Sequence, residues 1–392
     1  MAVKETISIF NYISIGVIAF IISFALTPFI KFLAIKFNVV DKPDYIRKFH
    51  SQPKALMGGI AIYAGFILTI AYCYFYIPSF SKIFPVKNYN GLLISSFLIL
   101  MLGFFDDLYN LGPFLKLFFQ IIPAIILFFY DFKIDILTNP LTGETLNLPD
   151  WASFVLTIIW IISLTNAINL IDGMDGLAAG ITIIGCCTLF IIALNRGAED
   201  VISALLTMSL LGATAGFIKY NFPPASIFMG DSGSLFIGFI LSAVGISGIN
   251  KSTTAIALMV PIAAVGLPVY DTLFAILRRT RRGNKIFSAD SEHIHHRLLK
   301  VGLSNRQTLL LLYGLSVYFG VIAYAFIKIS NQMAILLLVF FIFSIFILAT
   351  YLRKKEVKIY IRQKQEDMKR ATEINEKNNI SEIEERQFED YR

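Results

Sequence analysis

The sequence is short of charged residues and of cysteine. Of its 392 residues, 16% are Asp, Glu, Lys or Arg, against roughly a quarter in an ordinary soluble domain. The three cysteines, Cys73, Cys186 and Cys187, all lie inside apolar segments, so we expect neither a disulfide framework nor a zinc site. The phosphate-loop pattern GxxxxGK[ST] is absent from the sequence, which excludes an ATPase of that class.

Long apolar runs are abundant instead. Hydrophobic residues make up 56% of the chain, and runs of about 18 to 22 residues, the length of a membrane-crossing helix, recur up to about position 350. The runs do not alternate with period two, which argues against a β-barrel. The first run is longer than a signal-peptide core and shows no small-residue cleavage site, so we expect it to be retained. The predicted fold class is an all-α polytopic membrane protein.

Eleven spans are predicted, at about 8–30, 58–79, 91–107, 113–130, 152–171, 179–195, 201–219, 234–250, 254–276, 308–328 and 332–351. They form a transmembrane domain over residues 1–352, followed by a charged tail, helical or disordered, over 353–392. Lys and Arg gather in the loops 31–57 and 278–308 and at the start of the tail, whereas the loop 131–150 has one Lys against four acids. The positive-inside rule therefore puts the N-terminus outside and the C-terminus in the cytoplasm of a plasma (inner) membrane. This orientation explains the net charge of +7 without nucleic acid as a partner.

Four polar segments fall on the same side in this topology. They are "GFFDDLYNLGP" (103–113), "NLIDGMDGLAAG" (169–180), "NFPPASIFMGDSGS" (221–234) and "SEHIHHRLLK" (291–300). The topology was fixed by Lys and Arg alone, yet all four segments reach the cytoplasmic face. We therefore expect a single active site at that face.

Asp106 and Asp107 stand at the end of a predicted span. Adjacent residues on a helix point about 100° apart, so one carboxylate can face a metal ion while the other faces a substrate. Acids at a helix C-terminus oppose the helix dipole, so we expect a compensating cation nearby. A solvated pair of acids at a helix end is the alternative.

Asn166, Asn169, Asp172 and Asp175 are spaced by three residues. They share one face if the helix continues through them. Such a face offers the hard oxygen ligands that Mg²⁺ prefers. A capping and turn segment is the alternative.

Asp231 lies between two glycines just before a predicted span. It is either a helix N-cap or part of a helix N-terminus that accepts phosphate. Lys54 and Lys116 are cations on the same face, and each either meets phosphate or simply extends to the membrane surface.

The segment at 291–300 contains His293, His295, His296 and Arg297. Zinc would require thiolates or a separated second histidine pair, and neither is nearby. Among Arg and Lys residues the segment is more typical of a diphosphate clamp. A pH-responsive surface loop is the alternative.

Carboxylates, amides and cations on one surface are typical of metal-assisted phosphoryl transfer. One reactant is then a lipid phosphate in the membrane, and the other a soluble, anionic, activated donor. A secondary transporter is a rival class, but its acids should lie near the midplane of the membrane in broken helices. A non-catalytic scaffold is a second rival.

The motifs "FDDLYNL", "NAINLIDGMDGLAAG", "FMGDSGS" and "HIHHRL" resemble, in order and side, those of the polyprenyl-phosphate N-acetylhexosamine-1-phosphate transferases. The resemblance covers about residues 31 to 306. It implies ten or eleven helices, Mg²⁺ or Mn²⁺, and transfer of a sugar 1-phosphate from a UDP-sugar to undecaprenyl phosphate with release of UMP. A homodimer is left open.

The resemblance also implies residue roles, which fall into three groups. The residues matching metal-binding positions are Asn169 and Asp231. The residues matching catalytic positions are Asp106, Asp107 and Asp231. The residues expected near the substrates are Lys54, Lys116, Asn166, Asp172, Asp175, Asn221, His293, His295, His296 and Arg297. The family's DDxxD pattern ends here in Asn110, which weakens the case for a third carboxylate.

A single displacement is favoured, in which Asp107 or Asp106 takes a proton from the lipid phosphate, while a double displacement through a carboxylate intermediate stays open. "HIHHRL" is similar to the WecA/TagO type of the family, so UDP-N-acetylglucosamine is the expected donor. The alternative is the MraY type, which transfers phospho-N-acetylmuramoyl-pentapeptide.

Overall fold

The computed structural model describes residues 9–41, 53–77, 80–138, 144–196, 200–249, 265–281 and 293–326, together with scattered positions from 328 to 365. The predicted tail from 353 onward falls almost wholly outside these residues. The predicted last span, 332–351, does so in part.

Helices dominate the described residues. In chain order the elements are α1 (Ile9–Lys36), β1 (Val40–Asp41), β2 (Lys54–Ala55), α2 (Gly58–Tyr76), α3 (Phe80–Ile83), α4 (Val86–Tyr109), α5 (Pro113–Phe129), β3 (Ile136–Thr138), β4 (Thr145–Asn147), α6 (Asp150–Ile171), α7 (Leu177–Arg196), α8 (Val201–Asn221), α9 (Gly230–Ile249), α11 (Gly266–Arg281), α12 (Ile294–Lys300) and α13 (Asn305–Phe326).

Eight helices in the described part of the chain are long and apolar enough to cross a membrane: α1, α2, α4, α6, α7, α8, α9 and α13. α5 is apolar but has 17 residues. These nine helices coincide with nine of the predicted spans, and the prediction of an all-α polytopic membrane protein is confirmed. The predicted span at 254–276 overlaps α11 but begins outside the described residues, so the count of eleven remains a prediction.

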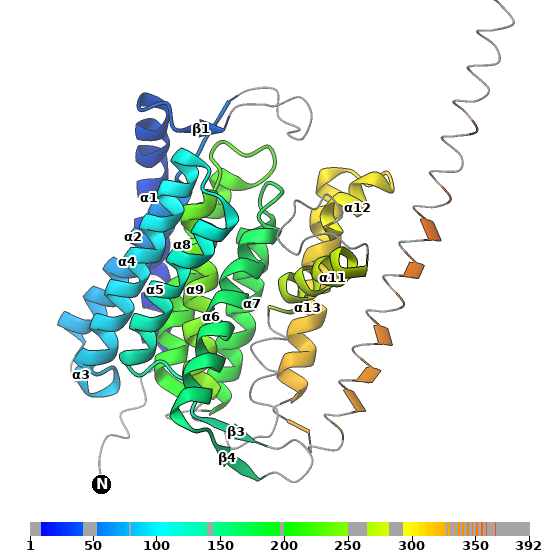
Figure 1. The fold of residues 1–392 in the computed structure, drawn as a ribbon. Helices are drawn as coiled ribbons and strands as arrows, with labels where there is room; N and C mark the ends of the chain where they lie inside the picture. Colours follow the sequence, from blue (N-terminus) through cyan, green and yellow to red (C-terminus); the bar gives the residue numbers. More distant parts are fainter. Residues whose placement is uncertain are drawn as a thin grey trace, which may run out of the picture.

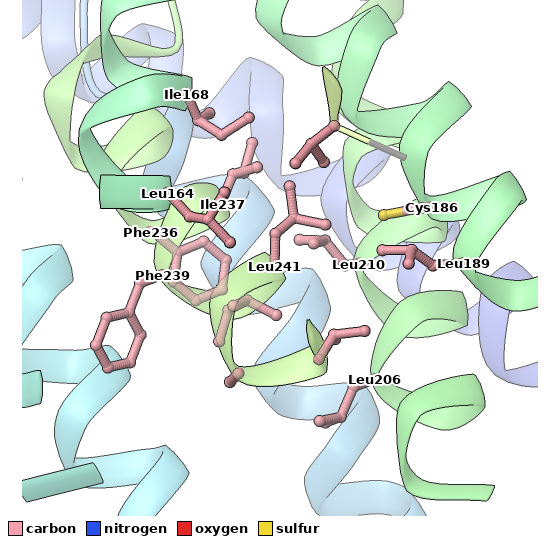
Figure 2. Close-up of a cluster of buried hydrophobic side chains, with 14 of the residues drawn as sticks. Leu164, Ile168, Cys186, Leu189, Leu206, Leu210, Phe236, Ile237, Phe239 and Leu241 are labelled. Carbon is pink, nitrogen blue, oxygen red and sulfur yellow. The ribbon is translucent and has the colours of Figure 1, made fainter. Parts of the chain in front are cut away.

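α9 lies near the centre of the bundle, with α4, α6 and α2 against it, and α8 packs between α1 and α7 (Figure 1). Aliphatic and aromatic side chains of α6, α7, α8 and α9 interlock between these helices, Phe236, Leu241 and Leu210 among them (Figure 2). Lipid tails are as apolar as these side chains, so close packing rather than water exclusion holds the helices together.

Two glycines bring neighbouring backbones against the start of α9. A Cβ on Gly59 of α2 would lie 2.1 Å from the backbone nitrogen of Gly233, and a Cβ on Gly103 of α4 would lie 2.5 Å from the carbonyl oxygen of Asp231. A side chain at either position would push the helices apart. Because glycine has no side chain, the N-terminus of α9 packs directly against α2 and α4, and this packing fixes the position of Asp231.

The two ends of the bundle differ. At one end, β1 pairs antiparallel with β2, and Ala55 forms an isolated parallel bridge with Ile227. At the other end, β3 and β4 form a hairpin (Figure 1). All four predicted polar segments reach the β1–β2 end, because α4, α6 and α8 finish there and α9 begins there.

Candidate active site

A cavity of about 430 Å³ opens at the β1–β2 end of the bundle, within the usual size of a ligand pocket. Its walls come from α4, α6, the α6–α7 connection, α8, α9 and α12. The predicted site residues that line it are Asp106, Asp107, Asn169, Asp172, Asp175, Asn221, Asp231 and His296. Segments far apart in the sequence therefore meet at one site, as predicted.

Asp106 is buried in the last turn of α4. Its Oδ1 accepts a hydrogen bond from the backbone N–H of Leu111 at 2.7 Å. Its Oδ2 lies 2.5 Å from the Lys116 Nζ, which also lies 3.0 Å from Asp231 Oδ2. Lys116 is thus the compensating cation that the helix dipole predicts, and it joins two of the predicted catalytic acids.

Asn110 ends α4 in the left-handed backbone region, with φ of 48°. Asn enters this region more readily than most residues, and helices commonly end in it. Asn110, the residue at which the sequence departs from the DDxxD pattern, therefore has a backbone role as the C-cap of α4.

Asp107 caps α9 from a neighbouring helix. Its two carboxylate oxygens accept the backbone N–H groups of Asp231 at 2.7 Å and Ser232 at 3.1 Å. Gly230 precedes them with φ of +73°, and a Cβ there would lie 2.5 Å from Asp107 Oδ2. α9 therefore begins four residues before the predicted start, and Asp231 lies in its first turn. The prediction that Asp231 stands before the span was wrong, because a partner 124 positions away caps the helix.

Asn169 connects the acids to α6. Its Nδ2 donates to Asp231 Oδ1 and, at 2.9 Å, to Ser234 Oγ, and its Oδ1 accepts from Lys116 at 3.3 Å. Asn166, one turn deeper, instead exchanges hydrogen bonds with the Gln120 amide. Asn169 lies in the cavity wall, and Asn166 does not.

The row of residues spaced by three does not lie on one helical face. α6 ends at Ile171, and Asp172 is its C-cap residue. The pKa of the Asp172 carboxyl is held well above its usual range, first by burial and then by the nearby carboxylates of Asp231 and Asp107. Further negative charge is therefore costly here, and the site favours a cation.

Asp175 and Lys54 both hold the loop that follows α8. Asp175 Oδ2 accepts the backbone N–H of Ala225 at 2.8 Å, and Lys54 Nζ donates to the carbonyl of the same residue at 2.6 Å. Lys54 does not line the cavity, so its direct contact in this structure is with the loop.

Asn221 and Tyr313 hold the backbone of Gly176. Asn221 Oδ1 accepts the Gly176 N–H at 3.0 Å, and its Nδ2 donates to the Ile227 carbonyl at 3.0 Å. The hydroxyl of Tyr313, on α13, donates to the Gly176 carbonyl at 2.6 Å. Gly176 has φ of +75°, a left-handed conformation that glycine adopts without strain. The side chains of Asn221 and Tyr313 hold the α6–α7 turn in this conformation.

The three histidines are not equivalent. His296 lines the cavity, whereas His293 and His295 are buried and are not part of its wall. Burial first, and then the neighbouring His296, lower the pKa of His295 to about 3, so this imidazole is neutral at pH 7. A Cβ on Gly173 would lie 2.5 Å from His295 Nε2. Arg297 is partly buried and is not part of the cavity wall.

Several residues of the cavity wall were not predicted from the sequence, including Asp41, Phe228 and Asn305. Phe228 is the first residue of the "FMGDSGS" motif, and its place in this motif could have identified it as a residue of the site. Asp41 and Asn305 stand at the ends of ordinary loops, and nothing in their neighbourhood distinguishes them.

Six carboxylates line the cavity: Asp41, Asp106, Asp107, Asp172, Asp175 and Asp231. Lys116 contacts two of them. Within the described residues, no three His, Cys, Asp or Glu side chains are placed as a ready-made metal site. The negative charge of the ionised acids in this group is the feature that a bound cation would balance.

Comparison with known proteins agrees with this arrangement. Residues 89–249 match the family model "Glycosyl transferase family 4". The chain is 39% identical over 311 residues to the probable undecaprenyl-phosphate N-acetylglucosaminyl 1-phosphate transferase of Bacillus subtilis (strain 168), covering 78% of this chain and 84% of the relative. It is 34% identical over 329 residues to the decaprenyl-phosphate N-acetylglucosaminephosphotransferase of Mycolicibacterium smegmatis, covering 79% and 80%.

A third relative is more distant. The undecaprenyl-phosphate alpha-N-acetylglucosaminyl 1-phosphate transferase of Escherichia coli (strain K12) is 26% identical over 288 residues, covering 72% of this chain and 75% of the relative. With the acidic cavity, the matched family model and relatives that align over most of their length, the chain belongs to the polyprenyl-phosphate N-acetylhexosamine-1-phosphate transferases of glycosyl transferase family 4.

Proposed function

We propose that the protein transfers N-acetylglucosamine 1-phosphate from UDP-N-acetylglucosamine to undecaprenyl phosphate, releasing UMP and starting a cell-envelope glycan. The observation that carries this proposal is the pair of acids Asp106 and Asp231, joined by Lys116, in the wall of a cavity where helices of the membrane bundle end. Relatives whose printed names include this activity support it.

The proposed reaction is a single displacement. An oxygen of the lipid phosphate forms a bond to the β-phosphorus of the donor, and the bond from that phosphorus to the bridging oxygen breaks, so that UMP leaves. A phosphate monoester loses its second proton with a pKa of about 6, so most of the acceptor is already ionised at neutral pH.

The chemistry therefore does not require the general base for which the sequence favoured Asp107 or Asp106. Both oxygens of Asp107 accept backbone N–H groups of α9. We assign Asp107 the role of holding Asp231 in place, and Asp106 with Lys116 the role of arranging charge around the phosphates.

We also propose that the site uses Mg²⁺ or Mn²⁺. The donor set fits, since carboxylate and amide oxygens are hard ligands and the carboxylates of Asp106, Asp107 and Asp231 line the same cavity as the Asn169 amide. Asn169 and Asp231 would hold the ion, which would neutralise the charge of the donor diphosphate. Lys116 lies beside both residues and adds a fixed positive charge at the same place.

The proposed orientation puts the cavity at the cytoplasmic face of the plasma membrane. Basic residues lie at the cavity end, where Lys36 ends α1 and Arg306 stands in the first turn of α13. This end is the one to which the positive-inside rule assigns the cytoplasm. A transporter is disfavoured because the acids gather at one end of the bundle.

A donor screen tests the proposal. Purified protein is given undecaprenyl phosphate, Mg²⁺ and either UDP-N-acetylglucosamine or UDP-N-acetylmuramoyl-pentapeptide, and lipid-linked sugar is extracted and measured. We expect product with the first donor, little with the second, and none after chelation with EDTA. Product with the muramoyl donor alone would replace the proposed activity with that of peptidoglycan synthesis, and product resistant to EDTA would overturn the metal proposal.

A further inference from the structure

The short helix α12 begins without a cap of its own. His293 is its N-cap residue and makes no side-chain capping hydrogen bond. The first N–H groups of any helix need acceptors from elsewhere. Asp271, on α11, supplies one, since its Oδ1 accepts the backbone N–H of Ile294 at 2.9 Å. A carboxylate at this end of a helix also suits the helix dipole.

The same carboxylate fixes an imidazole ring. Asp271 Oδ2 lies 2.8 Å from His293 Nδ1, and both side chains are buried, at 3% and 6% exposed. A carboxylate acceptor at Nδ1 requires a proton on that nitrogen, which sets the direction of the ring. One side chain of α11 thus fixes the backbone and the first side chain of the histidine segment.

The fixed ring stands at one end of a row that reaches the cavity. The rings of His293 and His295 are parallel, with centroids 6.0 Å apart, and those of His295 and His296 are 4.2 Å apart. His296 lines the cavity. The three rings thus form a continuous row from His293 to the side chain that lines the cavity.

We propose that Asp271 is a positioning residue for donor binding. It holds His293 and the start of α12 so that His296 keeps its place in the cavity wall. This inference rests on the proposed function, because it takes the occupant of the cavity to be a nucleotide-sugar diphosphate. The sequence around Asp271 predicts no role for this residue.

The variant Asp271→Asn is the first test. An amide can still accept one hydrogen bond, but it presents N–H groups or a weaker acceptor to His293. We expect KM for UDP-N-acetylglucosamine to rise about tenfold, because a charged hydrogen bond to the positioning ring is lost. We expect kcat to stay within about twofold, since the interaction affects binding before it affects the displacement.

The matched control is Asp200→Asn. Asp200 is as buried as Asp271, at 2% exposed, and pairs with Arg196 at the opposite end of the bundle. Loss of this buried acid should lower thermal stability and leave KM unchanged. If Asp271→Asn acts only by destabilising the protein, KM will be unchanged in both variants and the active fraction will fall equally in both. That result would overturn the inference.

A double-mutant cycle separates positioning from mere support. If Asp271 acts through His293, then His293→Asn alone should raise KM by a similar factor, and combining it with Asp271→Asn should add little further. His293→Asn keeps the bond from Asp271 to Ile294, so it also reports if Asp271→Asn fails to fold. Additive effects, or a wild-type KM in either single variant, would overturn the inference. Absence of lipid-linked product from the wild-type protein would instead overturn the proposed function.

Discussion

Both ends of the helix bundle hold an acid beside a cation, but the two ends balance charge differently. At the β3–β4 end, Arg196 Nη1 donates to the Gly248 carbonyl at 2.8 Å and lies 3.6 Å from Asp200 Oδ2. One acid faces one base, and the pair ties the end of α7 to the start of α8 and the end of α9. At the cavity end, Lys116 lies between two acids, and further carboxylates line the space beside it.

The difference separates a structural ion pair from a binding site. A buried charge is expensive unless it is paired. Arg196 offsets the charge of Asp200 between packed helices and outside the cavity wall, although Asp200 Oδ1 is buried without a hydrogen-bond partner. Several acids around a cavity favour the binding of a cation, and a bound cation can in turn hold a diphosphate. Each of the following predictions tests this distinction, in order of decreasing expected effect.

The acid at the cavity should matter for activity and the acid at the opposite end should not. Asp231→Asn removes the charge that meets Lys116 while nearly keeping the shape of the side chain. We expect formation of lipid-linked N-acetylglucosamine to fall by about 100-fold or more, as for loss of a charge-stabilising group in an active site. Asp200→Asn should retain activity while its thermal unfolding temperature falls. An equal loss of transfer activity in the two variants would show that the two ends of the bundle do not differ in this way.

The two lysine pairs give the second comparison. Lys116→Met leaves two acids without their cation, and we expect a cost of about 3 kcal/mol in stability with at least tenfold lower activity. Lys87 forms a 2.8 Å ion pair with Asp131, in which both side chains are about half exposed. Lys87→Met should change stability by less than about 1 kcal/mol and leave activity intact. Thermal unfolding and the transfer assay measure both variants.

The third prediction concerns the contact between Gly173 and His295. Gly173→Ala would place a methyl group 2.5 Å from His295 Nε2, so the imidazole must move. We expect activity to fall several-fold with little change in expression. Gly314→Ala is the control, because a Cβ there meets nothing within 4 Å. If the two alanine variants are indistinguishable, the packing of α12 against this turn has no part in activity.

The smallest expected effect is at Tyr313. Tyr313→Phe removes the hydroxyl that donates to the Gly176 carbonyl, a hydrogen bond expected to contribute about 1 kcal/mol. We expect about a fivefold loss of kcat/KM. Tyr318, on the same helix, bonds Ser344 Oγ at 3.3 Å away from the cavity. Tyr318→Phe should keep full kcat/KM, and a fall equal to that of Tyr313→Phe would show that the α6–α7 turn is not held by this contact.

The membrane helices and the place of the site were predictable from the sequence. Hydropathy finds the spans because lipid requires continuous apolar helices. The sequence predicts that the polar segments meet on one side of the bundle, and the cavity that both Asp175 and Asp231 line confirms this meeting. Even the cation near Asp106 follows from the helix dipole, since acids at the end of α4 need one.

The details that escaped the sequence depend on long-range contacts. A spacing of three residues fits a helix and a turn equally well, so the end of α6 at Ile171 could not be foreseen. The capping of α9 by Asp107 joins distant positions, and no local pattern reports it. Asp271 stands in the stretch "GLPVYDTLFAIL", where an isolated acid gives no hint that it supports a helix 23 residues later.

The most direct test of the account follows the β-phosphate of the donor. Purified protein is supplied with undecaprenyl phosphate, a divalent cation and UDP-N-acetylglucosamine carrying ³²P in the β-phosphate, and the lipid and aqueous phases are counted separately. Phosphosugar transfer predicts that the label enters the lipid while unlabelled UMP is released in equal amount, and that Asp231→Asn abolishes both. Label remaining in free UDP while sugar enters the lipid would show transfer of the sugar alone, and would contradict the account.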